Sequence, residues 1–323
     1  MRKSNEYKRK RWGAAAGVVL AIAALCWMIA PQMAGAWGRG AFYVIGTGPA
    51  GPQTATLQAL ETMKKMDAII ADERHAKLFA DYIGKAPLLF DPWKGRWDYK
   101  GKPYNKLNPK ELAEFQVERF KGRDRNVARI KELLAQGKNV GLLDSGNPCL
   151  FGPSHWYVEH LDPADLVVIA GMGCDAAGMA ALKRSAIPAH GARFVVQTAP
   201  FFLAGRESPD MSFDPDDPKA AEALADLAKH EHTMVLYMAL KEPEKLFKSL
   251  GRFLPADMPA ACVFWAGYPE KERVVRGTVG DLGPKLAQDP ERFMGLLFIG
   301  RFLEGKPYEA AMRRGQAKGV KKQ

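Results

Sequence analysis

The feature that most constrains the fold is a regular alternation of short apolar runs with helical segments. In the first half, the apolar runs occupy 41–45, 67–72, 139–146 and 165–171, and helical patterns fill 75–84 and 110–136. Short apolar strands that alternate with helices are typical of an α/β domain built on a mainly parallel sheet. The sequence therefore predicts an α/β fold.

The second half is richer in strands, which suggests a second domain. Strands are expected at 194–199, 233–240, 261–267, 272–279 and 293–300, after a helix rich in small residues at 175–186. A chain of 323 residues is long enough for two domains with separate cores. We therefore divide the chain into a leader, an N-terminal α/β domain, a C-terminal α/β domain and a basic tail, at 1–37, 38–168, 169–305 and 306–323.

The leader combines a basic start with an apolar stretch. Residues 1–12 carry six basic residues and one acid, and residues 13–30 carry no charge. A helix of this length would span ~27 Å, close to the bilayer core. We expect one N-terminal hydrophobic helix that anchors the chain in the membrane. The alternative is a signal peptide cleaved near Ala34-Gly35-Ala36. The basic start would place the body outside the cytoplasm.

The net charge of +11 is concentrated at the two ends of the chain. Residues 1–12 contribute +5 and residues 313–323 another +5, so the body between them carries +1. A nearly neutral body argues against a nucleic-acid partner. The four scattered cysteines form no CxxC pair, and the histidines lack metal-ligand spacing, so we expect no metal site.

A glycine-rich turn follows the first strand. Residues 46–51 read G-T-G-P-A-G, which matches the G-x-G-x-x-G pattern of dinucleotide-binding sites. Such a site binds pyrophosphate through backbone N–H groups, and Pro49 and Pro52 have none. The chemistry therefore disfavours a dinucleotide, although the turn still connects a strand to a helix.

Six segments in order resemble the tetrapyrrole methylase family, whose members use S-adenosylmethionine to methylate intermediates of corrin and sirohaem synthesis. The segments are GTGPAGPQTATL at 46–57, GKNVGLLDSGNPCLFG at 137–152, AGMGCDAAGMAALKRSAIP at 170–188, TMVLYMAL at 233–240, MPAACVF followed by ERVVRGTV at 258–279, and FMGLLFIG at 293–300. The resemblance implies a two-domain fold with the ligand cleft between the domains. It also implies a homodimer and a tetrapyrrole-like substrate.

The resemblance also implies which residues bind S-adenosylmethionine. Glycine turns and small side chains would surround this compact ligand from five segments of the chain. The cofactor-binding residues expected from the matched motifs are Gly46, Gly48, Pro49, Ser145, Gly146, Asn147, Leu150, Gly173, Cys174, Met238 and Ala261. For Met238 and Ala261, burial in a strand core is an equal alternative.

Two ionisable residues are candidates for acid–base chemistry. Some family members use an acid after the second strand and a lysine beyond it, which places these roles on Asp72 and Lys85. A carboxylate would accept the proton lost on carbon methylation, and a lysine would pair with acidic substrate arms. Both residues also suit an ordinary charged surface. The insert at 91–109, rich in Trp, Tyr and Lys, would cover a planar polyanion or form a surface excursion or a membrane-facing loop.

The chain departs from the family pattern at two acids. Gly51 and Asn147 stand where the motifs have aspartates. Together with the leader, these departures support an alternative to the methyltransferase: an exported, catalytically degenerate binding or carrier protein on the same fold. An active methylase would instead need its body in the cytoplasm, where the methyl donor is made.

Overall fold

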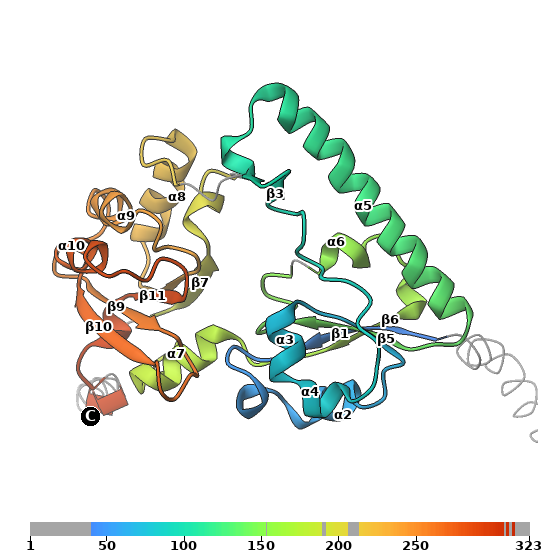
Figure 1. Ribbon diagram of the computed structural model, residues 1–323. Helices are drawn as coiled ribbons and strands as arrows, with labels where there is room; N and C mark the ends of the chain where they lie inside the picture. The colour runs from blue at the N-terminus through green and yellow to red at the C-terminus, as the bar shows by residue number, and fades with distance from the viewer. Residues whose placement is uncertain are drawn as a thin grey trace, which may run out of the picture.

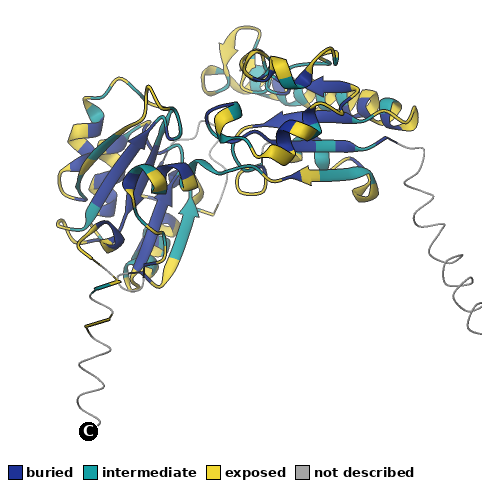
Figure 2. Cartoon of the chain, turned by 90° about the horizontal axis from the view of Figure 1, so that it is seen from below, coloured by how far each residue is buried: buried dark blue, intermediate teal, exposed yellow. Residues whose placement is uncertain are grey.

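The computed structural model describes an α/β protein with two lobes, each built around its own sheet (Figure 1). It covers residues 40–152, 154–188, 192–205, 213–306, 308–309 and 312–313. Figure 2 shows the central strands of both sheets as buried, whereas edge strands and the outer sides of the helices are partly exposed. The α/β architecture expected from the alternating pattern is confirmed.

The first lobe contains a four-stranded parallel sheet in the order β2-β5-β1-β6. These strands are β1 Phe42–Gly46, β2 Ala68–Ile70, β5 Val140–Asp144 and β6 Leu166–Ile169. Gly46 lies opposite Asp144 in the register of β1 and β5. Because all four strands are parallel, their carboxyl ends meet at one edge. Figure 1 shows this edge facing the second lobe.

Helices cover both faces of the parallel sheet. The alternation of side chains along β1 turns Ile45 towards one face and Phe42 and Val44 towards the other, and each face has its own apolar core. The first face packs against α2 Leu57–Met63, α3 Glu73–Leu78 and α4 Ala80–Ile83. The second packs against α5 Pro109–Ala135 and α6 His155–Val158.

The second lobe contains a mixed five-stranded sheet in the order β10-β9-β11-β8-β7. Its strands are β7 Phe194–Thr198, β8 His232–Leu236, β9 Pro259–Phe264, β10 Arg273–Thr278 and β11 Gly295–Ile299. Strands β8 and β9 both run antiparallel to β11, and β7 runs parallel to β8. The carboxyl ends of β7, β8 and β9 therefore share one edge with the start of β11.

One face of this sheet is covered by α7 Cys174–Leu182 and the other by three helices. The three helices are α8 Pro218–Ala228, α9 Pro243–Leu250 and α10 Leu282–Ala287. Helix α7 approaches the strands closely, because a Cβ at Gly178 would lie 2.5 Å from the Phe298 ring. This explains the small residues of α7. Single 3₁₀ turns occur at Pro52–Thr54, Tyr104–Lys106, Pro163–Asp165, Pro200–Phe202 and Arg301–Leu303.

The insert at 91–109, which was expected to be a loop, contains two short paired strands. Two short strands, β3 Asp98–Tyr99 and β4 Lys102–Pro103, form a hairpin. The rings of Tyr99 and Tyr104 lie 5.8 Å and 5.4 Å from that of Phe115 on α5. Aromatic packing against α5 thus holds the insert on the first lobe.

The predicted membrane localisation has to be corrected. Within the described part of the chain, no helix is long and apolar enough to cross a membrane. The leader segment 13–30, on which the predicted anchor or signal peptide depends, lies outside the described residues, as does most of the basic tail. The anchor is therefore not carried into the functional account.

Candidate functional site

Three glycine-containing loops meet at the carboxyl edge of the parallel sheet. The backbone N–H of Thr47 donates to the Asp144 carbonyl at 2.8 Å, and Gly48 and Gly146 exchange two backbone hydrogen bonds of 3.4 and 3.0 Å. A Cβ at Gly46 would lie 2.4 Å from the backbone nitrogen of Gly171. Side chains at Gly46 or Gly171 would force the loops apart, so their contact requires glycine.

The second lobe contacts these loops directly. A Cβ at Gly267, which follows β9, would lie 3.3 Å from Pro49 in the first lobe. The guanidinium of Arg74 on α3 lies 5.6 Å from the ring centroid of Tyr268. The lobes also approach each other at Phe151 in the first lobe and Phe202 in the second, whose ring centroids are 5.9 Å apart. The two sheet edges therefore border one site between the lobes.

Two residues at the second-lobe edge have a left-handed backbone. Met238 follows β8 with φ of 51°, and Trp265 follows β9 with φ of 52°. Non-glycine residues rarely adopt this conformation, and such strain gathers at binding sites. The backbone N–H of Trp265 donates to the Met294 carbonyl at 2.8 Å, which joins this turn to the loop before β11.

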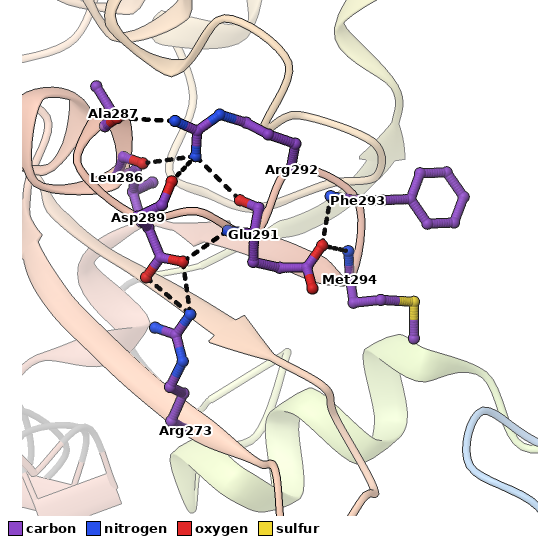
Figure 3. Close-up of polar contacts among 8 residues, drawn as sticks. All are labelled: Arg273, Leu286, Ala287, Asp289, Glu291, Arg292, Phe293 and Met294. Carbon is purple, nitrogen blue, oxygen red and sulfur yellow. Dashed lines mark hydrogen bonds and ion pairs between the residues drawn. The ribbon is translucent and has the colours of Figure 1, made fainter.

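A polar network fixes that loop (Figure 3). Arg292 donates to backbone carbonyls at the end of α10, including that of Ala287 at 2.8 Å. Glu291 accepts from the backbone N–H groups of Phe293 and Met294 at 2.9 and 3.0 Å. Phe293 points away from the network in Figure 3 and is 63% exposed. The network therefore presents an apolar ring beside the second-lobe edge.

The start of α7 carries a polar cluster. Gln197 on β7 donates to Asp175 at 3.1 Å, and the Tyr237 hydroxyl donates to Gln197 at 3.4 Å. Burial, together with the Asp175 charge, raises the pKa of Tyr237 and brings the pKa of the Cys174 thiol to about 11. The Cys174 thiol is thus protonated at neutral pH and unreactive.

A buried acid–base group lies at the ends of β2 and β5. Asp72 caps α3 by accepting from the His75 backbone N–H at 2.9 Å, and its second oxygen lies 2.7 Å from His75 Nδ1. Burial opposes ionisation of Asp72, but these hydrogen bonds outweigh it and lower its pKa to about 2. The His75 ring stacks on Phe79 at an interplanar angle of 8°.

Asp144, the last residue of β5, interacts electrostatically with His75. It is 2% exposed, and burial raises its pKa even though Ser154 and the charge of His75 favour the ionised form. Four buried side-chain atoms in the described residues lack a hydrogen-bond partner: Asp144 Oδ2, Ser154 Oγ, Tyr268 Oη and Arg119 Nε. Such atoms are rare and costly in folded proteins, and three of them border this site.

Most of the predicted cofactor-binding residues lie on the loops that meet here. They are Gly46, Gly48, Pro49, Ser145, Gly146, Asn147, Leu150, Gly173, Cys174 and Met238. Ala261 differs, because it lies within β9, completely buried in the core under α7. This position does not support a contact between Ala261 and the cofactor.

The two predicted acid–base residues are not brought together. Leu88 lies parallel to Ile69 at the sheet edge, so Lys85 enters this segment from the end opposite Asp72. Lys85 is exposed and has no partner among the described residues. The residue that does join Asp72 is His75, which the sequence reading missed. The D-x-x-H spacing, with the aspartate as helix cap, is the signal from which it could have been predicted.

The family can now be identified from the sequence. Residues 41–283 match the family model described as Tetrapyrrole (Corrin/Porphyrin) Methylases. The chain belongs to this family. S-adenosylmethionine, the cofactor expected from the motifs, is the methyl donor that tetrapyrrole methylases use.

Curated relatives are methyltransferases of the same kind. The chain is 26% identical over 273 residues to the cobalt-precorrin-4 C(11)-methyltransferase of Methanocaldococcus jannaschii, covering 82% of this chain and 89% of the relative. It is 25% identical over 268 residues to the uroporphyrinogen-III C-methyltransferase of the same organism, covering 81% and 96%. Both relatives are named C-methyltransferases, and their sequence identity to this chain is low.

Solved structures share the fold. A cobalt precorrin-4 methyltransferase of cobalamin biosynthesis aligns with a TM-score of 0.57 at 21% identity, covering 82% of this chain and 96% of that one. A uroporphyrin-III C-methyltransferase from Thermus thermophilus, complexed with S-adenosyl homocysteine, aligns with a TM-score of 0.52 at 17% identity, covering 82% and 99%. The tetrapyrrole methylase fold expected from the motifs is confirmed.

Proposed function

We propose that this chain is an S-adenosylmethionine-dependent methyltransferase that acts on a tetrapyrrole. The observation that carries the proposal is the meeting of the glycine loops with the second-lobe edge beside the Asp72–His75 pair. The relatives are methyltransferases, which favours an enzyme over the exported carrier. The homodimer implied by the resemblance stays a prediction.

The residues of the site fit the methyl donor. At Gly146, an added Cβ would meet only the Met172 carbonyl, at 3.9 Å, so the space beside this loop is open. The Asp175–Gln197–Tyr237 cluster offers an acceptor for the polar groups of the ligand. When bound, S-adenosylmethionine supplies an electrophilic methyl group. The glycine loops and Met238 would hold it, and positioning supplies much of the rate.

Carbon methylation leaves one proton to be removed from the substrate. A carboxylate with a pKa of about 2 is a weak base, so Asp72 alone suits this task poorly. Because a carboxylate only accepts, the Asp72–His75 hydrogen bond places a proton on Nδ1 and leaves the lone pair of the neutral ring on Nε2. We therefore assign removal of the substrate proton to the Asp72–His75 pair, in which Nε2 of His75 accepts the proton and the adjacent Asp72 carboxylate stabilises the resulting imidazolium.

Donor binding can be tested at Ser145, whose side chain follows Asp144 and is exposed. An exposed position tolerates a large side chain, so Ser145→Trp should obstruct the loop surface without disturbing the core. In calorimetric titration of the full chain with S-adenosyl homocysteine, we expect Ser145→Ala to bind like wild type and Ser145→Trp to bind at least about tenfold more weakly. The absence of binding by the wild type would overturn the proposal.

A further inference from the structure

A group of arginines surrounds one indole ring on the first lobe. The guanidinium carbons of Arg96, Arg119 and Arg123 lie 5.3, 5.2 and 4.9 Å from the ring centroid of Trp156. Arg119 and Arg123 lie on α5, Trp156 lies on α6, and Arg96 belongs to the insert before β3. Cation–π contacts of this kind help to hold each guanidinium in place.

The cation–π contacts of Arg119 and Arg123 leave hydrogen-bond donors available. A guanidinium carries five N–H groups, and a cation–π contact with a ring leaves N–H groups for other acceptors. Arg119 donates to Gln116 at 2.8 Å, and its Nε is one of the four buried atoms without a partner. Arg123 bonds Asp124 at 2.8–2.9 Å. Among the described contacts, Asp124 is the only carboxylate that pairs with either Arg119 or Arg123, so the two guanidiniums carry more positive charge than it neutralises.

The arginines lie close to Asp144, one of the buried acids of the proposed active site. Helix α6 begins directly after Ser154, which lies close to Asp144 at the end of β5. The Tyr157 hydroxyl donates to the Pro92 carbonyl at 3.1 Å, which ties the insert to α6. Trp97, in the same insert, is 49% exposed, and its ring centroid lies 5.5 Å from the guanidinium carbon of Arg96. An apolar ring surface and guanidinium donors are therefore adjacent.

We propose that Arg119 and Arg123, positioned by Trp156, bind the carboxylate arms of a planar polycarboxylate substrate whose ring lies towards Trp97. Carboxylates match the guanidinium edge with two hydrogen bonds, and the partly buried setting strengthens each pair. The identity of the ligand as a tetrapyrrole rests on the proposed function. The binding of a polycarboxylate by these arginines stands on the contacts alone.

The test is a fluorescence titration of the full chain with uroporphyrin III, a porphyrin with carboxylate arms. We expect Arg119→Gln and Arg123→Gln each to weaken binding about five- to tenfold, and the double variant more than about thirtyfold. Arg252→Gln, a surface arginine paired with Asp216 in the second lobe, is the matched control and should bind like wild type. A porphyrin with quaternary ammonium arms should bind none of the proteins tightly.

Two further measurements keep the outcomes distinct. Arg119→Lys/Arg123→Lys keeps the charge and the bulk but loses the paired donors, so it should fold and bind with intermediate affinity. Titration of the same variants with S-adenosyl homocysteine should give the wild-type affinity. Unchanged uroporphyrin affinity in the double Gln variant would overturn this inference while leaving donor binding intact. Lost porphyrin binding in a chain that binds no donor would overturn the proposed function instead.

Discussion

Replacing Asp72 tests the acid–base pair through stability. The Asp72 pKa of about 2, against about 3.9 in an unfolded chain, corresponds to ~2.6 kcal/mol. Because the side chain is 22% exposed, solvent screening reduces this to ~1–2 kcal/mol. A lowered pKa contributes stability above the unfolded value, which is lost as pH falls through about 2. We expect Asp72→Asn to cost ~1–2 kcal/mol at pH 5 and about half of that at pH 3.

The assay is urea denaturation followed by circular dichroism at pH 5 and pH 3, at constant ionic strength. Asn keeps an oxygen that can accept the His75 backbone N–H, whereas Asp72→Ala also removes the helix cap and should cost about 1 kcal/mol more at both pH values. If wild type and Asp72→Asn lose stability equally between pH 5 and pH 3, the hydrogen bonds from His75 do not lower the pKa of Asp72 as described.

Two more predictions concern other buried groups of the site. Because burial raises the pKa of Asp144, its ionisation costs stability as pH rises above the unfolded value of about 3.9. Asp144→Asn should therefore gain thermal stability relative to wild type between pH 4 and pH 8, and a constant difference would contradict this assignment. With a pKa of about 11, only about one Cys174 thiol in a thousand is ionised at pH 8. Mass spectrometry should find exposed Cys149 alkylated by iodoacetamide well before Cys174, and equal rates would refute the burial of Cys174.

The strands could be predicted because their apolar runs are bounded by turns. Each of the nine strands of the two sheets overlaps an apolar run of the sequence. The hairpin β3–β4 was missed because its strands have two residues each and one contains Pro103, which disfavours pairing. The helix expected over 75–84 is divided at Phe79, which has a non-helical φ of −109°.

Only the parts of the site that lie within local sequence motifs could be predicted from the sequence. The glycine turns follow strands, so parallel topology brings them together at one edge. The burial of His75 depends on stacking against Phe79 and on the nearby Asp144, and neither is visible in sequence spacing. Contacts across the lobes, such as Arg74 with Tyr268, likewise depend on the packing of distant segments.

The most direct test of the central claim is transfer of a labelled methyl group. The full chain would be incubated with methyl-labelled S-adenosylmethionine and uroporphyrinogen III, alone and with the methylated products made from it in situ by a uroporphyrinogen methyltransferase. We expect label in a tetrapyrrole fraction beyond that produced by the auxiliary enzyme, with release of S-adenosyl homocysteine. Label that stays in the donor with every tetrapyrrole offered would contradict the account.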